Sequence, residues 1–415
     1  MSWVSPKKGR LMMLPKKWNV GTIETIAKVA SGGTPSRENE SYWNGDIPWV
    51  TTAEVKFGLI LDTQQKITKS GLDNSSAKLF PANTILMAMY GQGKTRGQVA
   101  ILGIEASTNQ ACAALLLKEG YDIDFYYQYL VSQYENIREL ANSGGQQNLS
   151  AGIVKEIVVP IPPLPEQRKI AQILSTWDKS IVTTEKLIAA SQQQKKALMQ
   201  QLLTGKKRFA GFSEEWERYS LGNLVFIDKK SIGKSTPKDF SFRYISLSDV
   251  SAGVINNNLK VHQFMSAPSR ARRMVQIGDI LFSTVRPNLQ GFSIISEAYS
   301  DCIASTGFSV LTPKQNVCGN YIYQCLFSYD ITTQIDALVV GSNYPAINSS
   351  DVKELKIYCP NYPEQQKIAA VLTAADQEIN ALQSKLAHLK QEKKTLMQQL
   401  LTGKRRVVLE AETSH

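Results

Sequence analysis

The run Gly91–Thr95, with the letters GQGKT, resembles part of a phosphate-binding loop. That loop has the pattern G-x-x-x-x-G-K-[ST], and its backbone and lysine hold the phosphates of a nucleotide. The first glycine of the pattern would fall at position 88, which is Ala88. Residues 96–102 then continue as a polar turn and a short β-like run, whereas a phosphate would need a helix N-terminus. We expect a glycine-rich turn between strands, and an NTPase built on Lys94 is a rival hypothesis.

Other patterns of catalytic residues are weaker still. The tripeptides Glu54–Lys56 and Glu354–Lys356 have the E-x-K spacing of nuclease sites, but neither has an obvious partner aspartate for a metal ion. The sequence contains no G-x-S-x-G or H-E-x-x-H motif, and no N-P-P-[FY] or D-P-P-Y tetrapeptide of the kind that amino-methyltransferases use. The three histidines and five cysteines are scattered and show no C-x-x-C spacing. We therefore expect no catalytic residue, no disulfide framework and no metal site.

Basic and amide side chains point instead to nucleic acid. The net charge of +11 favours an anionic partner, of which nucleic acid is the commonest. Arginine can make two hydrogen bonds to a guanine edge, and asparagine or glutamine can make two to adenine. The alternative is that these side chains are ordinary polar groups on solvated loops. The candidate DNA contacts are Thr34, Ser36, Arg37, Tyr90, Gln92, Lys94, Arg96, Arg270, Arg272, Arg273, Arg286, Asn288, Gln290, Asn343 and Tyr344.

One stretch of the chain occurs twice. Residues 165–206 return as residues 363–404, shifted by 198 positions without a gap, and the run LMQQLLTGK is identical in the two copies. Two copies at so long a period indicate a duplicated module and not a solenoid. The duplication predicts a globular block, a long helix, a second block and a second long helix.

Each copy has the apolar periodicity of a coiled coil, with alternating steps of four and three residues. A proline followed by glutamate begins each copy, and Gly205 and Gly403 suit the position just past a helix end. Each helix should run about 38 residues, or roughly 57 Å, and neither could bury its apolar stripe alone. The predicted helix–helix seam consists of Ile170, Leu174, Trp177, Ile181, Ile188, Leu198, Leu202, Ile368, Leu372, Ile379, Leu382, Leu386, Leu389, Leu396 and Leu400.

Polar residues interrupt this seam. Thr184, Ser191 and Lys195 do so in the first copy, and Lys393 does so in the second. The two lysines occupy equivalent positions, and three explanations are open: they fix the register, they reach a partner subunit, or they lie where the coil splays apart. We favour the last. The sequence does not choose between a parallel and an antiparallel pair of helices.

The blocks before the helices, about residues 15–163 and 212–361, resemble each other only at fixed points. Each begins with a tryptophan at the 198-residue offset and contains a strand-like apolar run, at residues 84–89 and 279–284. Short β-rich runs broken by Gly, Asn and Pro predict compact mixed α/β domains. The predicted organisation is a first recognition domain at 1–163, a helix at 164–206, a second recognition domain at 207–361, a helix at 362–404 and a basic, polar tail at 405–415.

Taken together, these features resemble the specificity subunit of a type I restriction–modification enzyme. The residues that carry the resemblance are SGGTPS at 31–36, GDIPWV at 45–50, GDIL at 278–281, and the repeated PEQ and LMQQLLTG runs. The resemblance spans nearly the whole chain and follows the family's order of recognition domain, conserved helix, recognition domain and conserved helix. The second block departs from the pattern because it has STP at 235–237 in place of GGTP.

The resemblance implies an α+β fold in which two mixed α/β target-recognition domains are joined by two long helices, packed as an antiparallel coiled coil with pseudo-twofold symmetry. It implies a DNA-binding subunit without catalysis, whose domains each recognise one half of a bipartite, asymmetric sequence. Two methyltransferase (modification) subunits would dock on the helices and methylate adenine N6 with S-adenosylmethionine, taking the flipped base into their own pocket. Restriction (translocase) subunits would bring ATP and Mg²⁺. No cofactor is expected on this chain.

Two further alternatives stay open. One is the specificity subunit of a two-component enzyme, in which a single partner chain carries both methylation and cleavage. The other is a coiled-coil scaffold that binds no DNA, against which the basic, amide-bearing turns argue. No run approaches the roughly 20 apolar residues that span a membrane, and the N-terminus lacks the pattern of a signal peptide. We therefore expect a DNA-associated protein of the bacterial or archaeal cytoplasm, with no membrane partner.

Overall fold

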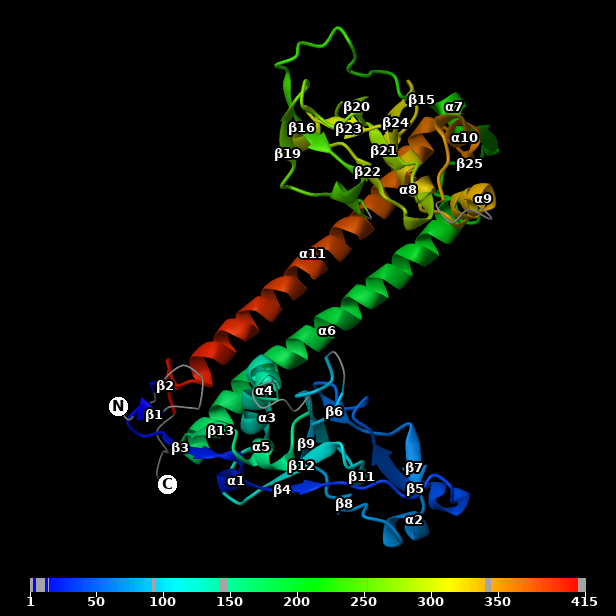
Figure 1. The fold of residues 1–415 in the computed structure, drawn as a ribbon. Helices are drawn as coiled ribbons and strands as arrows, with labels where there is room; N and C mark the ends of the chain where they lie inside the picture. The colour runs from blue at the N-terminus through cyan, green and yellow to red at the C-terminus, as the bar shows by residue number, and fades with distance from the viewer. Residues whose placement is uncertain are drawn as a thin grey trace, which may run out of the picture. The chain divides into compact units, whose positions relative to one another are not determined.

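The computed structural model describes residues 15–91, 94–141, 148–251, 253–339 and 345–409, and the backbone of two short paired strands, β1 (Trp3–Val4) and β2 (Met12–Met13). The chain divides into two units, and each long helix contributes to both (Figure 1). Unit 1 comprises Met1–Glu185 and Lys385–His415, and unit 2 comprises Lys186–Ser384. The two variable sequence blocks therefore belong to different units.

Two long helices, α6 (Leu164–Leu202) and α11 (Tyr362–Leu400), correspond to the two copies of the repeated sequence. Each has 39 residues, and every predicted seam residue is buried or half-buried. Gly205 and Gly403 follow the helices with φ angles of 70° and 69°, the left-handed conformation that glycine tolerates best. The structure therefore has a long helix at each copy of the repeat, followed by a glycine in the left-handed conformation. No helix in the described part of the chain has both the length and the apolar character needed to cross a membrane.

The two helices run antiparallel where they meet within a unit. In unit 1, Lys393 and Lys390 of α11 pair with Asp178 and Glu185 of α6, so rising residue numbers on one helix meet falling numbers on the other. Unit 2 shows the same arrangement with the roles of the two helices exchanged. The direction that the sequence left open is thus decided by contacts within each unit.

The two seam lysines correct one expectation. The side chains of Lys195 and Lys393 are only 16% and 13% exposed, and their Nζ atoms lie 2.6 Å from carboxylate oxygens of Asp376 and Asp178 on the opposite helix. The coil is closed at these positions, and the interpretation that it splays apart there is wrong. The lysines reach across the seam because a long side chain can bury its alkyl part and still place its ammonium beside a carboxylate.

Besides the pair β1–β2, the described part of unit 1 contains two larger sheets and one further two-stranded sheet. The five-stranded sheet has the order β4 (Ala27–Ser31), β12 (Cys112–Leu117), β9 (Ile85–Ala88), β10 (Val99–Leu102) and β6 (Leu59–Ile60). The four-stranded sheet has the order β7 (Gln65–Ile67), β5 (Trp43–Val50), β11 (Ala106–Thr108) and β8 (Leu79–Phe80). The two-stranded sheet pairs β3 (Asn19–Thr22) with β13 (Val158–Ile161). The shorter helices are α1 (Ile23–Ile26), α2 (Lys69–Asp73), α3 (Ile123–Ser132), α4 (Tyr134–Leu140) and α5 (Ala151–Lys155).

Unit 2 repeats this plan. One four-stranded sheet has the order β15 (Val225–Ile227), β24 (Phe308–Pro313), β21 (Ile280–Ser283) and β22 (Phe292–Ile294). The other has the order β19 (Lys260–Gln263), β16 (Ser241–Ile245), β23 (Ile303–Ser305) and β20 (Ala271–Met274). The small sheets pair β14 (Glu217–Ser220) with β25 (Lys356–Cys359) and β17 (Val250–Ser251) with β18 (Val254–Ile255). The shorter helices are α7 (Leu221–Leu224), α8 (Gly319–Leu326), α9 (Tyr329–Val339) and α10 (Ser349–Glu354).

The sheets of the two units correspond strand for strand. The order β4-β12-β9-β10 matches β15-β24-β21-β22, and β7-β5-β11-β8 matches β19-β16-β23-β20. In both four-stranded sheets of the second kind, the central pair (β5 with β11, β16 with β23) is parallel. The duplication therefore extends through the blocks, although their sequences have diverged.

Strand β9 shows why the apolar run at residues 84–89 is continuous. Ile85 and Met87 face one core cluster, whereas Leu86 and Ala88 face a second. A strand that is buried on both faces has no polar alternation. Strand β21 is buried on both faces in the same way, so both predicted strands are confirmed.

Candidate DNA-recognition surface

In unit 1 the segments that carry Thr34 and Tyr90 meet at the corner where the chain passes from β11 to β12. On one side, Gly33 N donates to the carbonyl of Thr108 at 2.8 Å, and the Thr34 hydroxyl donates to the side chain of Gln110. On the other side, the residue that precedes Tyr90 donates its N–H to the carbonyl of Ala111 at 2.8 Å. The corner belongs to both sheets, so the loop after β4 and the turn after β9 meet there.

The two glycines of the SGGTPS run are needed for this close approach. A Cβ atom on Gly32 would lie 1.9 Å from the carbonyl oxygen of Thr108, and one on Gly33 would lie 2.3 Å from the carbonyl carbon of Ser76. The indole N–H of Trp49 donates to the Gly33 carbonyl at 2.9 Å and holds the segment from the other side. Because any side chain would collide with backbone atoms, these positions require glycine.

Arg37 is exposed but held in one orientation. Its guanidinium carbon lies 3.8 Å from the ring centroid of Trp43, and its Nη2 donates to Gln65 Oε1 at 2.8 Å. The Trp43 indole in turn donates to the carbonyl of Ser36 at 3.0 Å. A guanidinium stacked on an aromatic ring loses little further entropy when it bonds a ligand. Trp43 and Gln65 therefore belong to this surface, although neither was predicted from the sequence. The closely spaced tryptophans 43 and 49 are the feature of the sequence that could have indicated Trp43.

The described residues on either side of the GQGKT run belong to a β-hairpin. Ala88 N donates to the carbonyl of Gln98 at 2.9 Å, and Gly97 N donates to the carbonyl of Ala88 at 2.8 Å, so the turn connects β9 directly to the antiparallel strand β10. A phosphate-binding loop would lead into a helix at this point. The predicted turn between strands is confirmed.

The side chains of this turn differ in exposure. Lys94 is exposed, Tyr90 is 43% exposed, and Arg96 is half-buried. The hydroxyl of Tyr134 on α4 donates to the Lys94 carbonyl, which ties the turn to that helix. Gln92 lies outside the described residues.

Unit 2 has the same arrangement at the corner between β23 and β24. Thr306 N donates to the carbonyl of Arg270 at 2.8 Å, and Thr284 N donates to the carbonyl of Gly307 at 2.9 Å. The basic cluster at the start of β20 and the turn after β21 therefore lie on either side of Thr306 and Gly307. The structure brings together, in each unit, candidates that are far apart in the sequence.

The three arginines at 270–273 have different surroundings. Arg270 is exposed, whereas Arg272 is half-buried and donates from Nη1 to the carbonyl of Ala271 at 2.7 Å. Arg273 forms a 2.8 Å ion pair with Asp228, and the two side chains are only 22% and 10% exposed. Arg273 thus has a structural role at the edge of the sheet, which the sequence did not indicate. Arg270 is the exposed member of the cluster.

The turn after β21 contains a 3-10 turn (Pro287–Leu289) between two non-glycine residues in the left-handed conformation. Arg286 has φ 49° and Gln290 has φ 53°. Arg286 N donates to the carbonyl of Pro345 at 2.7 Å, and Gln290 Nε2 donates to Thr332 Oγ1 at 3.3 Å. This conformation is costly for residues with a Cβ and persists only where the surroundings hold it. The turn is therefore fixed by its neighbours.

Three of the remaining candidates of unit 2 belong to this turn. Arg286 and Asn288 are exposed, and Gln290 is half-buried and engaged with α9. Asn343 and Tyr344 lie outside the described residues. The fixed turn therefore presents Arg286 and Asn288 to solvent.

The PEQ motif joins the start of a long helix to its recognition domain. In unit 2 the buried carboxylate of Glu364 accepts two hydrogen bonds from Arg208, at 3.0 and 2.7 Å, and one from the indole of Trp216, at 3.2 Å. Gln365 Oε1 accepts from the N–H of Cys318 at 2.9 Å. These bonds fix the domain against the helix N-terminus, which explains the residue types of the motif.

Unit 1 contains the equivalent cluster. Trp18 Nε1 donates to Glu166 at 3.1 Å, and Arg406 Nε donates to the same carboxylate at 2.8 Å. Gln167 Oε1 accepts from the N–H of Asp122 at 2.8 Å. Arg406 lies in the segment expected to be only a polar tail, so the first residues of that segment help to hold unit 1 together.

A second polar network joins each recognition domain to the coiled coil. In unit 1, Gln128 Nε2 on α3 donates to Asp178 Oδ2 at 2.7 Å, and Asp178 Oδ1 receives Lys393. In unit 2, Gln324 on α8 makes the same 2.7 Å bond to Asp376. Each network connects three helices and fixes how the domain sits on the helix pair of its own unit.

The acidic residue of the first E-x-K tripeptide closes a turn. Glu54 accepts hydrogen bonds from the N–H and hydroxyl of Thr51, both at 2.8 Å, and from the N–H of Gln64 at 2.9 Å. Among the residues that the structure describes, no group of three or more His, Cys, Asp or Glu side chains could hold a metal ion. Glu54 therefore stabilises a turn of its own domain.

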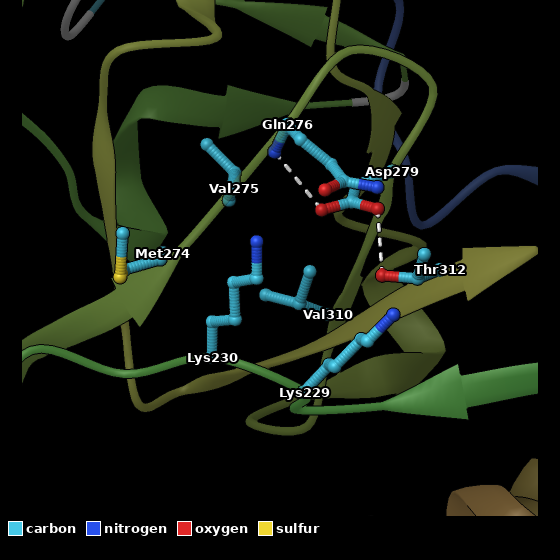
Figure 2. Close-up of a pocket in the computed structure, with 8 residues that line it drawn as sticks. All are labelled: Lys229, Lys230, Met274, Val275, Gln276, Asp279, Val310 and Thr312. Carbon is cyan, nitrogen blue, oxygen red and sulfur yellow. Dashed lines mark hydrogen bonds between the residues drawn. The ribbon is translucent and has the colours of Figure 1, made fainter.

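The aspartate of the GDIL run is also engaged with its own domain. Asp279 accepts from the Thr312 hydroxyl at 2.7 Å and from the N–H of Gln276 at 3.0 Å, and burial raises the pKa of its carboxyl (Figure 2). It borders a cavity of about 70 Å³. The other lining residues are Lys229, Lys230, Met274, Val275, Gln276, Val310 and Thr312. Among these lining residues the one carboxylate is already bonded through both oxygens.

Comparison with known proteins agrees with this architecture. Residues 15–191 and 213–391 each match the family described as Type I restriction modification DNA specificity domain. The Type I restriction enzyme MjaIX specificity subunit of Methanocaldococcus jannaschii is 24% identical over 424 residues, which cover 95% of each chain. The Type I restriction enzyme EcoR124I/EcoR124II specificity subunit of Escherichia coli is 29% identical over 163 residues, 38% of this chain and 40% of that one.

A solved structure shows the same fold. The S subunit of a Type-I restriction-modification system from M. genitalium superposes with a TM-score of 0.61 at 19% identity, covering 92% of this chain and 96% of that one. The family matches cover both halves of the sequence, and each half contains one recognition domain and the beginning of one long helix. The chain therefore belongs to the family of type I restriction–modification DNA specificity subunits.

Proposed function

We propose that this chain selects the DNA target of a type I restriction–modification complex, with each recognition domain binding one half of a bipartite sequence. The observation that carries the proposal is the duplicated corner, where two sheets bring arginine-bearing segments to one place in each unit. The scaffold is the same in the two units, but the side chains on it differ. Two different half-sites are the expected consequence, and the long helices would set the gap between them.

Chemistry on DNA would then come from other subunits. We infer that modification subunits supply S-adenosylmethionine and methylate adenine N6, with the target base flipped into their pocket. Restriction subunits would supply the ATP- and Mg²⁺-dependent steps. The engagement of Glu54 and Asp279 in turns supports a role in recognition for this chain.

Exchanging one recognition domain tests this function. Residues 212–361 are replaced by the corresponding block of another family member, and the chain is co-expressed with the neighbouring methyltransferase gene. Base-modification sequencing of the cellular DNA should show N6-methyladenine in a two-part motif, with only one half changed by the exchange. The matched exchange of residues 15–163 should change the other half. If the complex assembles and no methylated motif appears, the proposed function is wrong.

A further inference from the structure

The net positive charge of this chain lies outside its recognition blocks. Basic and acidic residues balance over residues 15–163 and 212–361 taken together, although the whole chain carries +11. The excess therefore belongs to the long helices, the residues that flank them and the N-terminal segment. Sequence-independent affinity for DNA depends on positive charge near phosphates. Part of the excess lies at the ends of the long helices, and one of these ends meets two lysines at the start of the first block.

Both long helices end in an exposed pair of basic residues, Lys206–Lys207 after α6 and Lys404–Arg405 after α11. In each pair the N–H of the second residue donates to a carbonyl in the last turns of the helix, at 3.1 Å. These bonds hold the pair at the C-terminal end of the helix, where the helix dipole favours cations. The backbone of the two pairs is therefore equivalent and fixed.

In unit 1 a second basic pair lies beside this helix end. The N–H of Trp18 donates to the carbonyl of Pro15 at 2.9 Å and closes a turn whose central residues, Lys16–Lys17, are both exposed. A Cβ on Gly403 would lie 2.5 Å from Pro15 Cδ, so this turn packs directly on the glycine that precedes Lys404–Arg405. We call these four basic residues the terminal basic patch. The ion pairs recorded among the described residues include none of the four.

Unit 2 supplies an internal comparison because it has the same scaffold with a different charge. Trp216 lies against Gly205, whose Cβ would be 3.5 Å from the indole. The two residues equivalent to Lys16–Lys17 are Glu214–Glu215. The helix end in unit 2 therefore combines Lys206–Lys207 with two glutamates, whereas the same place in unit 1 carries four positive charges.

We propose that the terminal basic patch binds phosphate groups of the DNA backbone and gives unit 1 a sequence-independent contact that unit 2 lacks. Exposed lysines and an arginine that pair with no carboxylate among the described residues suit phosphates. Their binding releases counterions from the DNA. The patch contains no asparagine or glutamine, so it positions the duplex and does not distinguish bases. DNA is favoured over an acidic protein surface because DNA is the anionic partner that the proposed function already gives this chain. The inference rests on the proposed DNA-binding function but concerns a separate surface.

The test measures binding of the intact chain to a fluorescent duplex without the target motif, by anisotropy between about 50 and 200 mM KCl. For the variant K16Q/K17Q/K404Q/R405Q, the slope of log affinity against log salt concentration should become shallower by about 2 to 4, because each phosphate contact contributes about 0.9. The matched control K206Q/K207Q should change the slope by less. The variant E214K/E215K should steepen the slope, because it gives unit 2 the charges of the patch.

Two results would overturn the proposal. One is an unchanged salt slope in the fourfold variant when its thermal unfolding midpoint equals that of the wild type. The other is an unchanged slope together with lost binding of the modification subunit, which would assign the patch to a protein partner. Failure of the proposed function is separately visible, since the wild-type chain would then direct no methylation, whereas this test uses only non-target DNA.

Discussion

The ammonium of Lys393 lies 2.6 Å from the carboxylate of Asp178, across the seam between the two long helices. The other oxygen of this carboxylate accepts a hydrogen bond from Gln128 at 2.7 Å, so a single side chain joins a recognition domain to both helices. The equivalent residues of unit 2, Lys195 and Asp376, are also 2.6 Å apart. The duplication has thus preserved a polar contact at a position where a coiled coil usually places an apolar side chain.

Replacing Lys393 with methionine should lower the free energy of unfolding by about 1–3 kcal/mol. The change leaves Asp178 without its cation in a partly buried place, but that aspartate is 41% exposed, so the loss should fall below that of a fully buried pair. Urea denaturation measures the loss, and a double-mutant cycle with Asp178→Asn should give a coupling energy of about 1 kcal/mol.

A matched control for this prediction is Lys390→Met. Lys390 pairs with Glu185 on the same two helices, but the side chains are 54% and 46% exposed. An exposed pair contributes little, so the change should stay below about 0.5 kcal/mol. If the two substitutions lowered the free energy of unfolding equally, burial would not explain the contribution of the Lys393–Asp178 pair.

Replacing Glu364 with glutamine should destabilise unit 2 by about 2–4 kcal/mol. Its carboxylate is fully buried and bonds Arg208 and Trp216, so the substitution leaves a largely buried guanidinium without its anion. Denaturation measures the loss, and the emission of Trp216 should shift because its indole loses a charged acceptor.

The control for this substitution is Glu378→Gln on the same helix. Glu378 is exposed and accepts only a 3.4 Å bond from Ser191, so its neutralisation should have little effect. If Glu364→Gln is as stable as this control, the buried ion pair does not hold the domain to the helix.

Arg286→Ala should weaken binding at one half-site by about 1–3 kcal/mol and relax the base preference there, if its guanidinium contacts a base. Arg37→Ala should act on the other half-site, because it lies in the other recognition domain. Binding to a panel of single-base variants of the methylated motif measures both effects. Arg218→Ala removes an arginine that already pairs with Asp330 and should leave the motif unchanged. If Arg286→Ala leaves both affinity and motif intact, its role at a base is excluded.

The cysteines should differ in reactivity in the folded chain. Burial raises the pKa of the thiols of Cys112 and Cys359 to about 12 and that of Cys302 to about 11, and it also raises the pKa of Cys325. Cys318 is half-buried. At pH 8 a maleimide should therefore label Cys318 first, and all five thiols only in denaturant, as mass spectrometry of labelled peptides would show.

The same pKa shifts predict a loss of stability at alkaline pH. The folded-state pKa of each buried thiol lies above the value of about 8.5 for an unfolded chain. The contribution to stability is therefore complete below about pH 8.5 and is lost as the pH rises towards 12. The unfolding midpoint in urea should fall over this range. Substitution of Cys112 and Cys359 with alanine should reduce that fall, and an equal fall in the variant would contradict this cause.

Local patterns in the sequence were sufficient for the long helices. The four–three spacing from Ile170 to Leu202, the proline and glutamate at each start and Gly205 at the first end all act within one helix. Periodicity and terminal residues are properties of neighbouring positions, so they can be recognised without a tertiary structure. The apolar run at Ile85–Ala88 was recognisable as a strand for the same reason.

The candidate DNA-recognition surface could be predicted only in part from the sequence. Residue type identified Arg37, Arg270 and Arg286 as possible DNA contacts, but not their surroundings. Arg273 has the same side chain as Arg270, yet it pairs with Asp228, which is remote in the sequence. The stacking of Arg37 on Trp43 likewise depends on how a loop folds over a strand.

The duplication, the long helices with one apolar face and the mixed α/β character of the blocks between them could all be recognised from the sequence alone. The tertiary structure decided the direction of the helices, the order of the strands and the partner of each polar residue. Lys393 shows the physical reason. Its place on the seam follows from local periodicity, but its pairing with Asp178 needs two segments far apart in the chain to meet in one register, and only the folded packing of both fixes that register.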